Sequence, residues 1–285
     1  MPSSVEELVE LLDLEAIEDN LFRGRQPVTM MQRVFGGQVL AQALVAAIRT
    51  TDDRLACHSL HSYFLRPGDT QVPIVYDVEA LRDGRSFGTR RVVARQHGRA
   101  IFYLTANFQV PEEGLEHQDR MPDVPSPEDC WPAVERGRAQ ANQDWLREWS
   151  ALDVRPIADS RGGGTLSGND HPARSQWWIR ASGQLPDDPI NQLAAFTYAS
   201  DMTLLPATLV PHGLYIESPG MQAASLDHSI WFHRPFRADE WWLYDQVSPS
   251  ASGGRGLALA RVFSQDGLLV ASVAQEGLIR VHPQD

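Results

Sequence analysis

The sequence contains no lysine, so arginine supplies every basic side chain apart from histidine. Schiff-base and pyridoxal phosphate enzymes, Walker-type nucleotide hydrolases and protein kinases each depend on a lysine, and its absence excludes all of them. HExxH and GxGxxG motifs are absent as well. The glycine-rich run SRGGGTLSGND at residues 160–170 lacks the flanking strand and helix of a phosphate-binding loop, so we interpret it as a plain loop.

Cysteine, long apolar runs and positive charge are scarce too. The two cysteines, Cys57 and Cys130, form neither a metal-type pair nor a disulfide framework. We find no apolar run long enough to span a bilayer, and the acidic N-terminal stretch is unlike a secretory or mitochondrial leader. The net charge of −12 lacks the basic footprint of nucleic-acid binding. We therefore expect a cytoplasmic protein with no nucleic-acid or membrane partner, no metal and no cofactor.

The chain repeats one pattern. HSLHSYFLRPGD (His58–Asp69) and DHSIWFHRPFRAD (Asp227–Asp239) both place an aromatic pair at the same interval before Arg-Pro. The interval from that proline to a later turn glycine is 31 residues in the first half and 32 in the second, ending at Gly98 and Gly267. Strand-like segments follow each block: VPIVYDVEAL, FGTRRVVARQ and RAIFYLTANFQV in one half, WWLYDQV, GLALARVFSQ and LLVASVAQEGLIR in the other.

One apolar helix is predicted ahead of each block, at residues 35–49 and from Ile190 to about residue 205. A helix that is apolar on most of its surface requires covering on several sides, which a curled antiparallel sheet provides. We predict an α+β fold with two such domains, at residues 1–112 and 171–285. Residues 113–170 are predicted to be a linker with a short helix at Trp131–Trp149 and the glycine-rich loop. SQWWIR is the expected first strand of the second domain.

The second predicted helix carries an acid on the face that should be buried. Asp201, in YASDMTLLP, shares that face with Ile190, Ala194 and Thr197 if the helix continues. A buried carboxylate needs partners or a raised pKa, because an unpaired buried charge costs several kcal/mol. Asp201 is thus either a catalytic group or a structural acid that caps a following turn.

Seven motifs, in order along the chain, resemble the TesB-like acyl-CoA thioesterase II family. They are LFRG (Leu21–Gly24), VFGGQVLAQAL (Val34–Leu44), HSLHSYFLRPGD, YDVEALRDGRSF (Tyr76–Phe87), YASDMTLLP, SLDHSIWFHRPF (Ser225–Phe236) and ASVAQEGLIR (Ala271–Arg280). The resemblance implies a double hotdog, two sheets each wrapped round a long helix, and hydrolysis of fatty acyl-CoA to free acid and CoA. It also implies association into a homodimer or homotetramer.

The catalytic residues implied by the resemblance are Asp201, Ser225 and Gln275. The family often has threonine where this chain has Ser225, which keeps the hydroxyl and loses a methyl group. A carboxylate can act as general base on a water, and serine and glutamine offer the donors and acceptors that fix it. We further expect the backbone N–H groups of Gly36 and Gly37, at the start of the first helix, either to bind the substrate oxyanion or merely to permit tight packing.

Other residues and functions have competing interpretations. The histidines near the repeat, His58, His61, His228 and His233, are interpreted as structural. Because both halves share them, Arg66 and Arg234 are also predicted to be structural. The densest arginine cluster, a set of weak candidates for binding the CoA phosphates, is Arg82, Arg85, Arg90 and Arg91.

Three alternative functions remain at this point. A hotdog hydratase would need a histidine five residues after Asp201, where this chain has Pro206. A non-catalytic acyl-CoA binding protein would keep a pocket but would not need the Asp/Gln pair. A serine hydrolase would be labelled by a fluorophosphonate.

Overall fold

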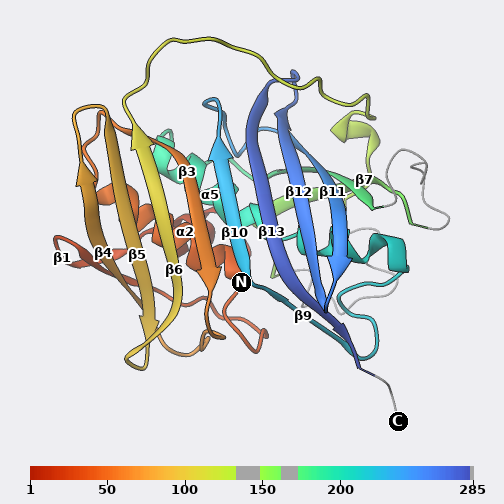
Figure 1. Cartoon of the computed structure of the whole chain (residues 1–285), viewed down its shortest axis with the longest axis horizontal. Helices are drawn as coiled ribbons and strands as arrows, with labels where there is room; N and C mark the ends of the chain where they lie inside the picture. The colour runs from red at the N-terminus through yellow and green to blue at the C-terminus, as the bar shows by residue number, and fades with distance from the viewer. Residues whose placement is uncertain (133–147, 162–172, 283–285) are drawn as a thin grey trace.

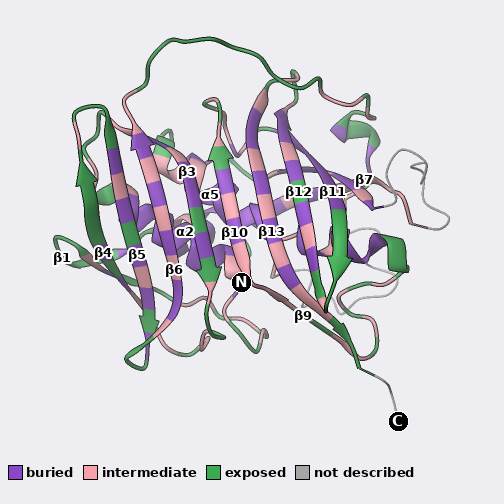
Figure 2. Cartoon of the chain, in the orientation of Figure 1, coloured by how far each residue is buried: buried purple, intermediate pink, exposed green. Residues whose placement is uncertain are grey.

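The computed structural model describes residues 1–132, 148–161 and 173–282. Its strands form one continuous antiparallel sheet, and the two long helices α2 (Gly36–Arg49) and α5 (Pro189–Ser200) lie against the same face of it (Figure 1). The protein is therefore an α+β double hotdog, as the sequence predicts. Strand positions alternate between buried and exposed along most of the sheet (Figure 2), because successive side chains point to opposite faces.

The first half of the sheet surrounds α2. Eleven of the fourteen residues of α2 are buried, which explains why this helix is apolar almost all round. The strand order is β1-β2-β4-β5-β6-β3. The elements of this half are α1 (Val5–Leu12), β1 (Glu15–Glu18), β2 (Leu21–Gly24), β3 (Ala56–Phe64), β4 (Ile74–Asp83), β5 (Phe87–Gln96) and β6 (Arg99–Gln109).

The second half repeats the arrangement around α5, with strand order β10-β13-β12-β11-β8-β7. The short strand β9 pairs with the distal part of β13. The predicted hairpin turns at Gly98 and Gly267 are present, both with positive φ. The elements are β7 (Leu152–Asp159), β8 (Arg174–Ala181), β9 (Met221–Ser225), β10 (Asp227–Phe232), β11 (Trp242–Ser252), β12 (Arg255–Ser264) and β13 (Leu269–Val281), with the 3₁₀ helices η1 (Pro127–Asp129) and η2 (Leu205–His212).

Strands β3 and β10 join the two halves edge to edge. They pair antiparallel over five residue pairs, from Asp227 with Tyr63 to Trp231 with Ser59. These strands carry the repeated motif, so the duplicated segments lie side by side at the centre of the sheet (Figure 1). The pairing covers one edge of each half, which leaves neither of these edges available to another chain.

The structure assigns one strand to the second half that the sequence boundary places in the linker. Strand β7 pairs with β8 from Leu152 to Asp159. The second domain therefore begins about twenty residues before the predicted boundary at residue 171. The polar composition around this strand hides it, because an edge strand needs an apolar face on one side only. Most of the helix predicted at Trp131–Trp149 and the greater part of the glycine-rich loop lie outside the described residues.

The second helix is shorter than predicted. It ends at Ser200, Asp201 is its C-cap, and the chain resumes as η2 at Leu205. Pro206 and Pro211 lack the backbone N–H that a continuous α-helix would need here. The apolar residues therefore continue along the chain past the point where the α-helix ends.

The apolar segment Pro189–His212 corrects a second expectation. By length and composition it could cross a membrane, but 83% of its most apolar window is buried inside the protein. Its place in the core accounts for its composition.

Candidate active site

Asp201 lies at the meeting point of the two domains. Asp201 is the C-cap of α5, so it follows the last residue of the helix. Its side chain points toward β13, β9 and the first turn of α2. Its carboxylate accepts hydrogen bonds from side chains on those strands, so it is not the simple cap of a following turn. The acid on the buried face therefore has partners, as its burial requires.

The three residues carried over from the family resemblance come together. Gln275 Nε2 on β13 donates to Asp201 Oδ1 at 2.5 Å and lies 2.9 Å from Ser225 Oγ. Ser225 Oγ in turn donates to Asp201 Oδ1 at 3.2 Å. Gln275 is fully buried, and its Oε1 is among the buried oxygens of the described chain that have no hydrogen-bond partner. Asp201 Oδ1 therefore accepts hydrogen bonds from two side chains, while the neighbouring Gln275 Oε1 can still accept one.

Burial dominates the electrostatics of Asp201. Desolvation raises the pKa of its carboxyl from 3.8 to about 6, although hydrogen bonds from Gln275, Ser225 and the Gly37 N–H act in the opposite direction. The C-terminal end of α5 also disfavours a negative charge, whereas the N-terminal end of α2 favours it. A carboxylate with such a pKa is ionised at neutral pH and still basic enough to take a proton from water.

The two glycines at the start of α2 have different surroundings. A β-carbon on Gly36 would overlap Asp201 Oδ2, and one on Gly37 would overlap the carbonyl oxygen of Tyr198 in α5. The Gly37 N–H favours the ionised form of Asp201 and so lowers the pKa of that carboxyl. Gly36 lines the cavity beside Asp201 and keeps the predicted role as a candidate.

A cavity of about 1080 Å³ opens onto Asp201, Ser225 and Gly36. Residues from both domains line it, and much of the wall is apolar. The large side chains of that wall include Phe35, Phe64, Phe102, Trp149, Trp177 and Met202. Such a mainly apolar cavity with a few convergent polar groups is typical of a small-molecule site. Three arginines also line it: Arg33, Arg66 and Arg161.

His228 is a site residue that sequence reasoning missed. It is fully buried on β10, and its Nδ1 lies 3.7 Å from Asp201 Oδ1. The other histidines on these strands agree with the structural interpretation, since His61 contacts Ser229 and His233 contacts Ser272 on the exposed face. The available signal was periodicity: His228 alternates with Ile230 on the inward face of its strand.

The repeated arginines have matching backbone contacts. Arg66 donates to the carbonyl of Ala100 at 2.7 Å, and Arg234 donates to that of Leu269 at 2.9 Å. Both tie the end of a central strand to the hairpin beside it. This confirms the shared structural role.

The first half has no equivalent of the catalytic residues. Ala106 on β6 is the position that matches Gln275 on β13. It pairs with Arg90 on β5, just as Gln275 pairs with Ala258 on β12. The C-cap of α2 is Thr50, where α5 has Asp201. The first domain therefore has neither a carboxylate at the end of its helix nor a glutamine at the matching strand position, so the candidate set occurs once among the described residues.

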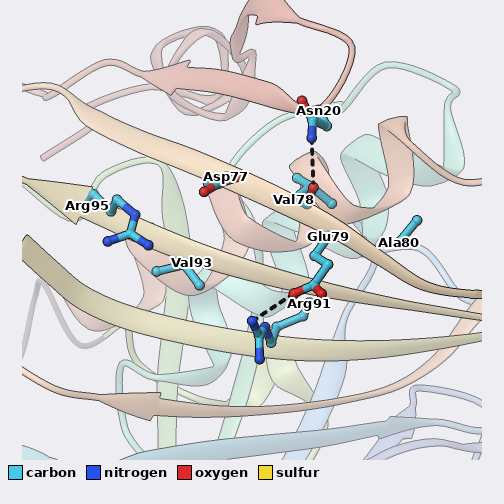
Figure 3. Close-up of a pocket in the computed structure, with 8 residues that line it drawn as sticks. All are labelled: Asn20, Asp77, Val78, Glu79, Ala80, Arg91, Val93 and Arg95. Atoms are coloured by element: carbon cyan, nitrogen blue, oxygen red, sulfur yellow. Dashed lines mark hydrogen bonds and ion pairs between the residues drawn. The ribbon is translucent and has the colours of Figure 1, made fainter.

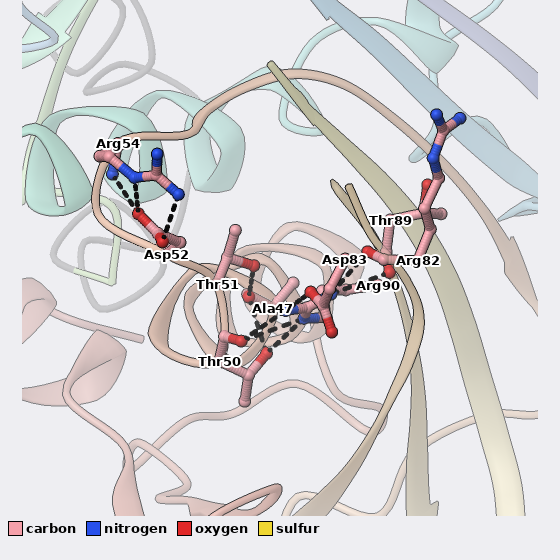
Figure 4. Close-up of polar contacts among 9 residues, drawn as sticks. All are labelled: Ala47, Thr50, Thr51, Asp52, Arg54, Arg82, Asp83, Thr89 and Arg90. Carbon is pink, nitrogen blue, oxygen red and sulfur yellow. Dashed lines mark hydrogen bonds and ion pairs between the residues drawn. The ribbon is translucent and has the colours of Figure 1, made fainter. Parts of the chain in front are cut away.

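In the first domain, Arg90 lies at the C-terminal end of α2, beside Thr50 (Figure 4). Its guanidinium is buried and donates to the carbonyl oxygen of Thr50 at 2.8 and 3.1 Å, to that of Arg82 at 3.1 Å and to Asp83 at 2.6 Å. None of the arginines in the sequence cluster at residues 82–91 lines the large cavity. The cluster is thus a poor candidate for phosphate binding, and Arg90 closes the end of α2 instead.

A second hollow lies over β4 and β5, with a volume of about 380 Å³. Its wall is polar, including Asp77, Glu79, Arg91 and Arg95, and Arg91 pairs with Glu79 at 2.7 Å (Figure 3). It shares no lining residue with the cavity at Asp201.

The spacing of GRSFG at residues 84–88 matches the GxSxG motif of serine hydrolases. These residues form the turn between β4 and β5, where the Gly84 N–H donates to Phe87 O at 2.9 Å. A nucleophile elbow requires a strand-to-helix turn, so this match provides no catalytic serine. Among the residues with described positions, no group of three or more His, Cys, Asp or Glu side chains could hold a metal ion.

Comparison with known proteins agrees with this geometry. Residues 25–109 match the family model described as "Acyl-CoA thioesterase N-terminal domain", and residues 150–278 match the one described as "Acyl-CoA thioesterase". The chain is 43% identical to acyl-CoA thioesterase 2 of Haemophilus influenzae, covering 98% of this chain and 99% of that protein. It is 39% identical to human acyl-coenzyme A thioesterase 8, covering 96% and 89%.

Solved structures show the same relationship. The acyl-CoA thioesterase II TesB2 of Mycobacterium marinum superposes with a TM-score of 0.83 at 46% identity, covering 98% of this chain and 99% of that one. A tesB protein of Mycobacterium avium subspecies paratuberculosis gives a TM-score of 0.81 at 32% identity, covering 97% and 99%. The matches extend over both domains, so the chain belongs to the acyl-CoA thioesterase family.

Proposed function

We propose that the protein hydrolyses medium- to long-chain fatty acyl-CoA to free acid and CoA at the cavity beside Asp201. The observation that carries the proposal is the contact among Asp201, Ser225 and Gln275, of which Asp201 and Ser225 line a large, mainly apolar cavity. The apolar wall suits an acyl chain, and the polar cluster suits the activation of water. The membership of the family supports the same activity.

The proposed reaction begins with a water between the Asp201 carboxylate and the thioester carbonyl carbon. Asp201 takes one proton from the water as its oxygen bonds to that carbon. The tetrahedral intermediate then collapses, the carbon–sulfur bond breaks, and the departing CoA sulfur receives the proton from Asp201. Atoms and charges balance, because one water is consumed and a carboxylic acid and a thiol are released. No covalent acyl-enzyme is required.

Gln275 and Ser225 fix the geometry of this step. Their hydrogen bonds occupy Asp201 Oδ1, which leaves Oδ2 as the oxygen that meets the water. Gln275 Oε1, a buried acceptor without a partner among the described atoms, can accept the water's second hydrogen. Holding the water in the geometry for attack lowers the entropic part of the activation barrier. Gly36 lines the cavity next to Asp201, and its backbone N–H is the proposed donor to the developing oxyanion.

The arginines at the cavity wall are the proposed partners of the CoA phosphates. Arg33 and Arg161 line the cavity, and the Arg161 guanidinium lies 4.0 Å over the ring of Tyr215. The protein has a net charge of −12, so a polyanionic substrate needs local positive charge to approach.

The test is release of free thiol from medium- and long-chain acyl-CoA by the wild type and by Asp201→Ala. We expect hydrolysis by the wild type and a loss of kcat of at least about a hundredfold in the variant, because the general base is removed. A non-catalytic binding protein would bind acyl-CoA and release no thiol above background. An Asp201→Ala variant as fast as the wild type would leave the activity and overturn the mechanism.

Acyl chain length, assembly and location are part of the proposal as well. We propose a cytoplasmic homodimer or homotetramer, which light scattering after gel filtration would measure. A series of acyl-CoA chain lengths would show where kcat/KM falls.

A further inference from the structure

His228 contacts the last residue of α5, immediately before Asp201. Its Nε2 lies 3.0 Å from Ser200 Oγ, and both side chains are fully buried. His228 lies one residue before Ser229, which pairs with Ala274, so the register places it beside Gln275. The imidazole therefore faces the catalytic cluster from β10 while Gln275 faces it from β13.

The hydrogen bonds of Ser200 define the tautomer of His228. Ser200 Oγ lies 2.8 Å from the carbonyl oxygen of Thr197, which has no hydrogen of its own to give, so the hydroxyl donates there. The same hydroxyl can then only accept from His228, which requires a proton on Nε2. Burial lowers the pKa of His228 to about 3, so the ring is neutral and Nδ1 carries no proton.

Two strands hold Ser200 from opposite ends. His228 on β10 binds its side chain, and the hydroxyl of Tyr244 on β11 donates to its backbone carbonyl at 2.9 Å. That carbonyl is one of the last of α5, which a helix leaves without a partner. The direction in which the chain leaves the helix, and hence the position of Asp201, is fixed by these two contacts.

The first domain supplies an internal comparison. The spacing that relates Arg66 to Arg234 relates Leu60 to His228, and Leu60 pairs with Ala106 on the neighbouring strand. Leu60 is fully buried as well. The fold therefore accepts an apolar side chain at this position in the domain whose helix is not followed by an acid.

We propose that His228 is a positioning residue for the hydrolysis: its Nε2–H holds Ser200 and thereby aligns the Asp201 carboxylate with the water. The inference rests on the proposed function of Asp201 and adds a residue that acts through another. His228 is not among the residues that line the cavity, so its loss should affect the chemical step and leave substrate binding intact.

The experiment compares His228→Leu with His228→Gln in thiol-release kinetics on the full chain. Leucine is the side chain of the matching position in the first domain, and glutamine can place an N–H donor near Ser200. We expect His228→Leu to lower kcat about ten- to a hundredfold with KM unchanged, the cost of a misplaced catalytic group. We expect His228→Gln to keep most of the activity.

Ser200→Ala is the coupled variant. It removes the acceptor of the same contact, so the double variant Ser200→Ala/His228→Leu should be no slower than the slower single variant. Nitrogen-15 chemical shifts of His228 should show a neutral ring with the proton on Nε2 throughout the pH range of activity. Melting temperatures of all variants report whether each one folds.

Three outcomes overturn the inference: wild-type kcat in His228→Leu, additive losses in the double variant, or a proton on Nδ1. If His228→Leu does not fold, the inference depends on Ser200→Ala, which must show the same loss of kcat at constant KM, and on the nitrogen-15 spectrum of the wild type. Failure of the proposed function appears separately, as no release of thiol above background by the wild type, and failure of the Asp201 mechanism appears as wild-type activity in Asp201→Ala.

Discussion

At the residue scale, Asp201 is held between effects of opposite sign. Burial favours its neutral form, while donors from Gln275, Ser225 and Gly37 favour the carboxylate. A general base requires this compromise, because a fully stabilised carboxylate would be too weak a base and an unsupported one would remain protonated. The same compromise predicts both the pH dependence of activity and a cost in stability.

We expect kcat/KM to fall as the pH decreases through about 6, since the raised pKa of Asp201 is about 6 and only the carboxylate accepts a proton from water. A profile of kcat/KM from pH 4.5 to 8.5 checks this. A decrease of kcat/KM centred near pH 4, the range of an ordinary carboxyl group, would contradict the conclusion that burial raises the pKa of Asp201.

Asp201→Asn should inactivate the enzyme and stabilise the fold. The folded protein binds the Asp201 proton more tightly than the unfolded chain, whose pKa is 3.8. The stabilisation from that proton is present below pH 4 and is lost as the pH rises through 6. Asparagine never ionises, so at pH 8 we expect a gain of up to about 3 kcal/mol in the free energy of unfolding. Denaturant unfolding at pH 8 and pH 4 measures it, and most of the difference should be lost at pH 4.

Sequence identified the three residues that meet at the site, but it missed what surrounds them. Ser225 and Gln275 were identified only through the family resemblance of their motifs, whereas Asp201 also stood out as an acid on a face expected to be buried. His228 lies in one of these motifs as well, yet its burial beside Asp201 follows from strand register and from where α5 ends. The strand register and the end of α5 are set by tertiary packing, which the periodicity of apolar residues along the chain does not reveal.

At the element scale, the first turn of α2 packs directly against the backbone of the last turn of α5. Gly37 lies against the carbonyl of Tyr198, and Phe35 packs edge-on against the Tyr198 ring at a centroid distance of 5.1 Å. The partial positive charge of one helix end thus lies beside the partial negative charge of the other. This contact brings the first turn of α2, in the first domain, against the end of α5 beside Asp201, in the second.

Gly37→Ala should separate the two helices. Its methyl group would overlap a backbone carbonyl, which cannot move as the end of a side chain can. We expect a loss of stability of about 1–3 kcal/mol and a larger relative loss of kcat, because overpacking shifts the backbone next to Asp201. Thermal melting and thiol release measure both. Gly114→Ala, with nothing within 4 Å, is the control and should match the wild type.

The sequence defined helices and strands better than their ends. The start of α2 was predictable from its glycines, and the six strands after the repeated blocks appear where alternation predicts them. The end of α5 was not predictable, because Met202, Leu204 and Leu205 continue the apolar pattern inside the core after the helix stops. Burial selects apolar residues in any backbone conformation, so composition alone does not mark the break.

At the scale of the whole molecule, two similar domains have divergent interiors. The end of α5 carries Asp201, which lines the cavity, and the end of α2 is closed by Arg90. Under the proposed function, the duplicated architecture serves chemistry in the second domain and structural support in the first.

Arg90→Leu should destabilise the protein and leave the active site unchanged. It removes the donors to the Thr50 and Arg82 carbonyls, for which we expect a loss of about 2–4 kcal/mol. Arg91→Leu is the matched control, because Arg91 is half exposed and its surface ion pair with Glu79 contributes little. Thermal melting compares the two. An unchanged melting temperature in Arg90→Leu, or a lowered kcat in its folded fraction, would contradict the assignment.

The pairing of β3 with β10 has a consequence for an active site built from two domains. In an enzyme whose two halves were separate chains, the site would disassemble on dilution. Here the halves are covalently linked and their meeting is intramolecular, so the local concentration of one half around the other does not depend on the amount of protein. The specific activity attributable to this site should accordingly stay constant however dilute the enzyme becomes.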